Sequence, residues 1–382
     1  MTEQLRKAAL LPFLLALAGQ PLPALAAPDA LEREPRRDAQ PTDASPAPLA
    51  EPAQPSVIGP YRVLHELGSG GMGSVHLAES TDNAGQHVAL KLMRSDSFSP
   101  ALLAQFDVEQ RALASASHDS IARFIGSGAT TDGRPWIAME WVEGQPITAY
   151  CDARRLDVDA RLALLGEVCD AVQHLHERGI IHGDLKPSNI LVTERDGRAR
   201  PKLIDLGLAR LRADAPDLDT PVMGTPAYMA PEQFDLAEPL RDERSDVFAL
   251  GRVLRELLVG EPHATSTARA GLGPILLASR APELPLRAHF DRLGAATDSV
   301  ARRRGTRARA LRRRLDRTLD GIAQRATEAR RERRFSGPRE LAMALREHLR
   351  DRARRADLAR DVLLVGAVST LAFACGVLFA SS

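Results

Sequence analysis

The sequence is poor in cysteine and carries almost no net charge. Its three cysteines, Cys151, Cys169 and Cys375, are too few and too widely separated for a disulfide framework or a zinc site. Lysine and arginine together number 51 and aspartate and glutamate 50, so no overall electrostatic field attracts nucleic acid. These shortages exclude a small disulfide-bonded secreted domain and favour a reducing compartment.

The balance of charge conceals one strongly basic region. Residues 301–317 contain nine arginines and one aspartate, and residues 330–334 add four arginines. A solvated helical face with a loop is the simplest interpretation. Binding of acidic protein substrates or of anionic lipid headgroups is the alternative.

Polar side chains suited to one kind of chemistry gather between residues 182 and 207. Residues 182–189 read HGDLKPSN, and residues 205–207 read DLG. Such a group supplies a carboxylate to orient a hydroxyl nucleophile, a carboxylate and an amide oxygen to bind Mg²⁺, and a cation near a transferred phosphate. Apolar runs at 190–192 and 202–204 around Asp196-Gly197 predict a hairpin, so the polar residues should lie on loops beside short strands.

A glycine-rich stretch lies near the start of the foldable part of the chain. Residues 67–78 read LGSGGMGSVHLA, and alternation of apolar residues continues through Val88, Leu90 and Leu92. Glycine allows a hairpin to approach phosphates with its amides exposed. Because a strand rather than a helix follows the glycines, the pattern argues against a Rossmann turn.

Lys91 is a charged residue inside this apolar strand pattern. Burying a lone ammonium is costly, so Lys91 requires an acidic partner. Glu109, on a helix predicted over residues 101–114, is the candidate, and Asp107 is its rival.

Together these motifs resemble the catalytic and magnesium loops of eukaryotic-like (Hanks-type) bacterial serine/threonine protein kinases. The resemblance covers residues 58–350, with a poor match over 261–306. It implies that Asp184 is the catalytic base, that Lys186 contacts the γ-phosphate, and that Asn189 and Asp205 bind Mg²⁺, with Mn²⁺ as an alternative. It further implies nucleotide contacts from Leu67, Gly68, Gly70, Gly73, Val75, Ala89, Lys91, Glu109, Met139, Glu140 and Val142, with Met139 as gatekeeper and the backbone of Glu140 and Val142 facing the adenine.

Two positions depart from the family's pattern. Gly183 stands where most members have an arginine that pairs with a phosphorylated activation loop, so activity is expected not to depend on that phosphate. Thr220, in the loop that follows, remains a candidate autophosphorylation site. Leu206 replaces a phenylalanine and keeps an apolar packing residue.

Residues 223–232, MGTPAYMAPE, resemble the family's substrate-binding segment. Together with Lys186, Thr225 in this segment indicates serine or threonine rather than tyrosine as the acceptor. The resemblance also implies that Asp246 anchors the catalytic loop and that Arg334 pairs with Glu232 as a buried structural contact.

Both ends of the chain carry apolar segments. Residues 1–27 have the basic start, apolar run and small-residue site of a secretory signal. Export would separate an ATP-dependent enzyme from ATP, so an N-terminus that is not cleaved, or one whose start is wrongly assigned, is favoured over a genuine signal. Residues 28–55 read as a disordered linker. Residues 362–380 contain no charge and are long enough to span a hydrocarbon core of about 30 Å, while a buried core helix is the alternative. The arginines that precede them place the folded domain in the cytoplasm.

The sequence therefore predicts an α+β, two-lobed protein kinase-like fold within residues 56–350. The β-rich N-lobe is expected over 56–142 and the larger helical C-lobe over 143–350, followed by a basic juxtamembrane segment (351–361) and a transmembrane helix (362–380). Expected partners are ATP, protein substrates with serine or threonine acceptors, the cell membrane and a second copy for autophosphorylation, but no nucleic acid. A membrane-bound pseudokinase scaffold and a small-molecule phosphotransferase are the alternatives.

Overall fold

The computed structural model describes residues 57–69, 73–93, 100–206, 210–211, 225–234, 242–260 and 279–380. The side chains of 100–105, 210–211, 359 and 362–380 are outside this description. The expectations for residues 1–27, residues 28–55, Gly70 and Thr220 therefore concern residues that lie outside the described part.

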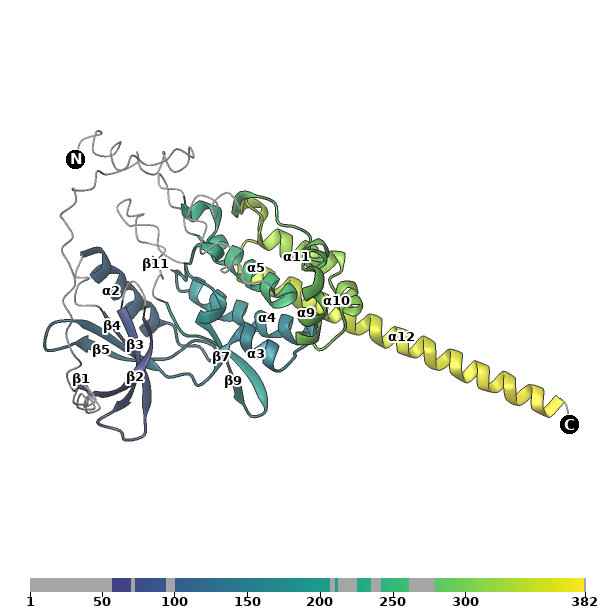
Figure 1. Ribbon diagram of the computed structural model, residues 1–382, viewed down its shortest axis with the longest axis horizontal. Helices are drawn as coiled ribbons and strands as arrows, with labels where there is room; N and C mark the ends of the chain where they lie inside the picture. The colour runs from purple at the N-terminus through teal and green to yellow at the C-terminus, as the bar shows by residue number, and fades with distance from the viewer. Residues whose placement is uncertain are drawn as a thin grey trace, which may run out of the picture. The chain divides into compact units, whose positions relative to one another are not determined.

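The N-lobe is a six-stranded antiparallel sheet with one helix (Figure 1). The strand order is β1 (Val57–Ile58), β2 (Tyr61–Ser69), β3 (Gly73–Ser80), β4 (His87–Met93), β6 (Pro135–Glu140) and β5 (Phe124–Ala129). The helix α2 (Pro100–Ser115) confirms the helix predicted over 101–114. Trp136 packs edge-on against Tyr61, with ring centroids 5.5 Å apart, and closes a small apolar cluster with Val88 and Leu90.

The C-lobe is built around two buried helices, α4 (Val158–His176) and α5 (Glu243–Val259). Each begins at an aspartate: Asp157 accepts a hydrogen bond from Ala160 N, and Asp242 accepts one from Arg244 N. These caps satisfy backbone donors that would otherwise be left free at a helix start. α5 ends at Gly260, whose φ of 80° suits a left-handed C-terminal residue.

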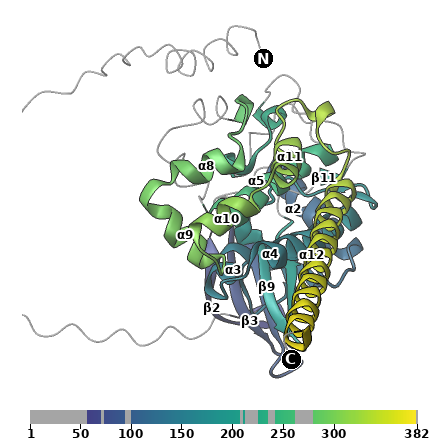
Figure 2. The ribbon, with the colours of Figure 1, turned by 90° about the vertical axis from the view of Figure 1, so that its right-hand side faces the viewer.

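Further helices surround α4 and α5 (Figure 2). They are α3 (Ile147–Ala153), α8 (Leu286–Arg292), α9 (Thr297–Arg303), α10 (Ala308–Arg314), α11 (Arg317–Ala326) and α12 (Pro338–Ala380), with short 3₁₀ turns η1 (Pro187–Asn189), η2 (Pro226–Tyr228), η3 (Pro231–Phe234), η4 (Gly294–Ala296) and η5 (Arg331–Arg333). The small strands are β7 (Gln145–Pro146), β8 (Ile180–Ile181), β9 (Ile190–Arg195), β10 (Arg198–Leu203) and β11 (Arg210–Leu211).

The hairpin predicted around Asp196-Gly197 is confirmed. β9 and β10 pair in antiparallel fashion from Arg195 and Arg198 to Ile190 and Leu203. Both turn residues have positive φ, 52° at Asp196 and 69° at Gly197, which is the backbone that an Asp-Gly hairpin turn requires.

The basic region at 301–317 does not form one solvated helical face. It includes the end of α9, all of α10 and the first residue of α11. Arg304 is buried and donates to the carbonyl oxygens of Leu258 and Glu256 at distances of 3.0 and 3.1 Å. Burial lowers the pKa of Arg304 to about 10, with the nearby Arg161 acting in the same direction and Asp152 opposing it. One arginine of the nine is thus a core residue, and the sequence pattern alone could not separate it from the others.

α12 continues as a helix through residues 362–380, the predicted transmembrane segment, whose side chains lie outside the description. Within the described part of the chain, no helix combines the length and the hydropathy needed to cross a membrane.

Candidate active site

Lys91 of β4 lies between two carboxylates that come from different parts of the chain. Its Nζ is 2.7 and 2.8 Å from the two carboxylate oxygens of Glu109 on α2 and 3.2 Å from Oδ1 of Asp205. The ion pair predicted between Lys91 and Glu109 is confirmed, whereas the rival Asp107 is exposed. The N-lobe sheet, its helix and the segment after β10 therefore meet at one ammonium group.

Electrostatics keep this ammonium charged. Burial by itself would lower the pKa of Lys91, but the carboxylates of Asp205 and Glu109 outweigh burial and raise the pKa above its ordinary value. Burial raises the pKa of Glu109, and the positive charge of Lys91 opposes that rise. The result is a fixed positive charge held next to the Asp205 carboxylate, which is 40% exposed.

The β9–β10 hairpin places Asn189 and Asp205 at its open end. Asn189 precedes β9, Ile204 follows β10, and Ile204 N donates to Asn189 O at 3.1 Å. The side-chain nitrogen of Asn189 donates to the backbone oxygen of Asp184 at 3.0 Å. This contact fixes the orientation of the Asn189 carboxamide, whose oxygen is the candidate ligand.

These oxygen donors fit a magnesium ion that is completed by substrate phosphates. Mg²⁺ is usually held by one or two protein oxygens together with phosphates and water. Among the described residues, no cluster of three or more His, Cys, Asp or Glu side chains could hold a metal by itself. Asn189 and Asp205 are thus suited to a shared site rather than to a metal site built from protein ligands alone.

Asp184, Lys186 and Thr225 form a second polar group. Asp184 Oδ2 accepts a hydrogen bond from Lys186 Nζ at 2.7 Å, and Asp184 Oδ1 accepts one from Thr225 N at 2.8 Å. Lys186 Nζ also donates to Thr225 Oγ1 at 2.8 Å. These contacts join residues 184–186 to the segment that contains Thr225.

Asp246, in the first turn of α5, holds the backbone of residues 182 and 183. Its Oδ2 accepts from His182 N at 2.9 Å, and its Oδ1 accepts from Gly183 N at 2.9 Å. His176 Nε2 lies 2.7 Å from Oδ2. Burial would raise the pKa of Asp246, but its hydrogen bond with His176 and its other polar contacts outweigh burial and hold the pKa below its ordinary value. The predicted anchoring role of Asp246 is confirmed, whereas His176, to which sequence reasoning assigned no role, is revealed as the residue that supports it.

One further ion pair and one backbone conformation define this region. Arg334 and Glu232 form the predicted buried pair, with distances of 2.6 and 2.8 Å between their two nitrogen and two oxygen atoms. Gly183 has a φ of 78°, a left-handed conformation that glycine adopts without strain. The left-handed backbone at this position therefore suits the glycine that stands where most family members have an arginine.

The predicted nucleotide-contacting residues of the N-lobe fall on adjacent strands. β4 pairs with β3 and β6, which places Lys91 opposite Val75 and Ala89 opposite Met139. Gly68 and Gly73 lie at the ends of β2 and β3 that flank the undescribed residues 70–72. A Cβ at Gly73 would come within 2.1 Å of Leu92 O, so this close approach of two strands requires glycine. Leu67 is largely exposed, and Met139 and Val142 are buried.

Lys202 is a site-adjacent residue that sequence reasoning missed. Its Nζ donates to Glu140 Oε2 at 2.6 Å. From β10 it therefore contacts the predicted hinge, the segment around Glu140 and Val142 whose backbone is expected to face the adenine. The overlooked signal is the scarcity of lysine, because only four of the 51 basic residues are lysines. Three of the four, Lys91, Lys186 and Lys202, make ion pairs in or beside this region.

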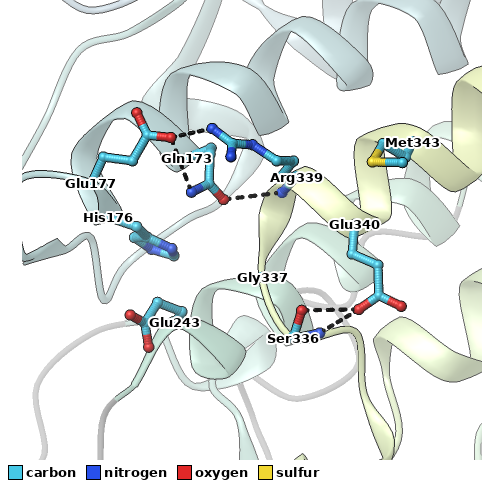
Figure 3. Close-up of a pocket in the computed structure, with 9 residues that line it drawn as sticks. All are labelled: Gln173, His176, Glu177, Glu243, Ser336, Gly337, Arg339, Glu340 and Met343. Atoms are coloured by element: carbon cyan, nitrogen blue, oxygen red, sulfur yellow. Dashed lines mark hydrogen bonds and ion pairs between the residues drawn. The ribbon is translucent and has the colours of Figure 1, made fainter.

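A cavity of about 410 Å³ lies elsewhere in the C-lobe, between the end of α4 and the starts of α5 and α12 (Figure 3). Its lining includes Gln173, His176, Glu177, Glu243, Ser336, Gly337, Arg339, Glu340 and Met343. Several of its polar groups already bond one another, including Arg339 with Glu177 and Ser336 with Glu340. The candidate active site is therefore the group of charged residues around Lys91, Asp184 and Asp205, and this cavity is not part of it.

A small antiparallel β-lobe joined to a helical lobe, with a lysine–glutamate pair facing an aspartate, defines the protein kinase fold. The family model "Protein kinase domain" matches residues 61–273, and the chain belongs to that family. The chain is 39% identical over 222 residues to serine/threonine-protein kinase Pkn1 of Myxococcus xanthus, covering 56% of this chain and 31% of that protein. It is 34% identical over 216 residues to serine/threonine-protein kinase PknB of Mycobacterium leprae, covering 54% and 34%.

Among solved structures, the PknI kinase domain of Mycobacterium tuberculosis has a similar fold. The TM-score is 0.53 at 26% sequence identity, and the match covers 77% of this chain and 98% of that one. The chain spans about a third of the length of the two curated relatives above. The family assignment therefore rests on the kinase domain, and the rest of the relatives' length has no counterpart in these matches.

Proposed function

We propose that the chain is a serine/threonine protein kinase that transfers the γ-phosphoryl group of Mg-ATP to hydroxyl groups of proteins. One observation carries the proposal: Lys91 contacts Glu109 and Asp205 at one end of the region, while Asp184 contacts Lys186 and Thr225 at the other. A scaffold that only binds partners has no chemical need for this complete set, and no observation favours the pseudokinase alternative.

At the nucleotide end, Lys91 serves as the phosphate-binding cation. Glu109 positions its ammonium group, and the raised pKa keeps that group protonated. Asp205 and Asn189 would supply the oxygen ligands for Mg²⁺ or Mn²⁺. The metal, when bound, would neutralise charge on the transferring phosphoryl group.

At the acceptor end, Asp184 orients the substrate hydroxyl and receives its proton. Its side chain is only 11% exposed and is fixed by hydrogen bonds to both oxygens, so little reorganisation is needed before reaction. Lys186 stabilises negative charge that develops on the transferred group. Thr225, bonded to both residues, ties the peptide-binding segment to the reacting centre.

The proposal includes attachment to the cell membrane through residues 362–380, with the kinase domain in the cytoplasm. Nineteen uncharged residues and the helical backbone of α12 support it. The arginines between 350 and 360 favour the cytoplasmic orientation. Autophosphorylation between two copies held in one membrane is part of the same proposal.

Phosphate transfer from labelled ATP by the full chain in detergent micelles tests the activity. Asp184→Asn should lower the transfer rate by about 10²–10⁴-fold because it removes the base, and Lys91→Met should also abolish transfer. Arg198→Met, on the exposed β9–β10 hairpin, is the matched control and should retain activity. The labelled residues should be phosphoserine and phosphothreonine.

Binding of a fluorescent nucleotide separates the alternatives. Asp184→Asn should still bind Mg-nucleotide, because Asp184 acts on the acceptor. If the unaltered chain binds Mg-ATP but transfers phosphate neither to itself nor to any protein acceptor, the pseudokinase scaffold hypothesis replaces the kinase hypothesis.

A further inference from the structure

Two arginine-rich segments that are far apart in the sequence meet in the C-lobe. Asp159, near the start of α4, forms ion pairs with Arg314 at the end of α10 and with Arg352 on α12. One carboxylate oxygen is shared by both guanidinium groups. The last turn of α10 is therefore linked, through the Asp159 carboxylate, to the part of α12 that leads into residues 362–380.

The two segments differ in their charge balance. Residues 350–361 contain five arginines but also three aspartates, so they are only weakly basic. Residues 301–317 contain nine arginines and one aspartate. The fold thus brings the most basic segment of the chain close to the predicted membrane segment, where α12 alone would provide little net charge.

Part of this charge is used within the C-lobe. Arg304 is buried, Arg312 pairs with Asp291, and Arg314 pairs with Asp159. Arg303 pairs with Asp152. The other five arginines of residues 301–317 form what we term the arginine face. It consists of Arg302, Arg307, Arg309, Arg313 and Arg317, all exposed and without an ion pair within the described residues.

The spacing within the arginine face concentrates positive charge on one side of a helix. Arg309 and Arg313 are four residues apart on α10, so their guanidinium groups share one side of the helix. Like charges at this spacing repel each other and destabilise a helix, so an anion bound between them would be stabilising. Guanidinium groups bind phosphate oxygens through two parallel hydrogen bonds, which makes phosphate the matching partner.

We propose that the arginine face binds the headgroups of anionic phospholipids in the membrane that anchors residues 362–380. This inference depends on the membrane attachment in the proposed function, and it adds a second contact that sets the orientation of the C-lobe. A lipid surface is favoured over a soluble polyanion because the face lies beside the helix that continues into the apolar segment.

The distances agree with this partner. Ten residues of helix separate Arg352 from Val362, which corresponds to about 15 Å along the axis. The headgroup layer occupies about 5–7 Å of that length. Arg352, which shares Asp159 with Arg314 of α10, therefore lies about one Debye length, roughly 8–10 Å, from the charged surface of the membrane. A modest tilt of α12 would bring the arginine face into contact with the headgroups.

Hydrogen–deuterium exchange on the full chain in nanodiscs tests the proposal. Nanodiscs of phosphatidylcholine alone are compared with nanodiscs that also contain phosphatidylglycerol. Amides of residues 302–317 should exchange more slowly in the anionic nanodiscs, and the difference should shrink at high salt. Arg309→Glu with Arg313→Glu should remove it, because each arginine near such a surface changes binding by about fivefold.

The matched control changes the same charge on the β9–β10 hairpin. Arg195 and Arg198 are exposed and make no ion pair within the described part of the chain. Arg195→Glu with Arg198→Glu should leave the lipid-dependent protection unchanged. Equal exchange in both kinds of nanodisc overturns the proposal, as does protection produced by RNA in solution but not by phosphatidylglycerol.

Flotation with vesicles separates this proposal from membrane attachment. Flotation with phosphatidylcholine vesicles alone supports attachment through residues 362–380 whatever the exchange result. If the chain floats only with phosphatidylglycerol vesicles, and Arg309→Glu with Arg313→Glu abolishes flotation, lipid binding by the arginine face is supported. The same result refutes attachment through residues 362–380. A chain that floats with neither refutes both.

Discussion

Lys202 Nζ lies 2.6 Å from Glu140 Oε2, and this ion pair joins the last N-lobe strand to the C-lobe hairpin. The same oxygen accepts a hydrogen bond from Arg123 N at 3.2 Å. Lys202 lies near the end of β10, three residues before Asp205. One carboxylate thus links the predicted adenine-binding hinge to the strand that leads to the predicted metal ligand.

Lys202→Met should raise the KM for ATP by about two- to fivefold with a smaller change in kcat, the size expected for a partly exposed ion pair. The reason is that the hinge loses its tie to β10, whereas Asp184 and Lys186 are untouched. Steady-state kinetics with varied ATP measure the split. Lys202→Arg keeps the charge and should largely restore the KM, and an unchanged KM in Lys202→Met would show that the contact has no part in nucleotide binding.

Asp246→Asn should destabilise the domain at neutral pH by about 3 kcal/mol, because several hydrogen bonds to a buried charged acceptor are weakened. Since folding lowers the pKa of Asp246, its contribution is present above its unfolded pKa of about 4 and is lost as pH falls through the lower folded value. Urea unfolding at several pH values should therefore show a weaker loss of stability on acidification in the variant. If the free energy of unfolding fell with pH to the same extent in both proteins, the role given to the Asp246 carboxylate would be contradicted.

Glu232→Gln should cost about 3–5 kcal/mol of stability because it leaves the guanidinium of Arg334 buried without its charged partner. Arg334 donates to the backbone oxygens of Arg244, Glu328 and Ala329 as well, so Arg334→Met should be at least as damaging. The double variant, measured by denaturant unfolding, should be more stable than the sum of the two losses predicts. Simple additivity would mean that the pair is not a coupled unit.

Thr220→Ala should retain most of the kinase activity. Gly183 offers no guanidinium to a phosphate in that loop, and its φ of 78° disfavours a side chain at this position. Transfer rates with and without phosphatase treatment provide the measurement. Thr225→Ala is a comparison that should lose activity, because it removes the hydroxyl group that accepts a hydrogen bond from Lys186 Nζ. A large loss in Thr220→Ala would refute this account of Gly183.

Local sequence patterns were sufficient wherever the structure depends on near neighbours. The Asp-Gly turn of the β9–β10 hairpin, the helix carrying Glu109 and the unfavourable burial of Lys91 each follow from backbone preference, periodicity or the cost of an unpaired charge. The motif at 182–189 added the identity of the family.

Contacts across long stretches of chain required the tertiary structure. His176 and Lys202 looked like ordinary polar residues until the fold placed them on Asp246 and Glu140. Arg304 looked like its eight arginine neighbours, although it alone is buried on backbone carbonyls.

The sequence by itself determined the chemical groups available, the family and the local strands and helices. Only the tertiary structure decided which charges are buried, which are paired and which remain exposed, as the shared contact of Arg314 and Arg352 with Asp159 illustrates. The physical reason is that the energy of a charge depends on its solvent exposure and on partners a few ångströms away, and both are set by packing between distant segments.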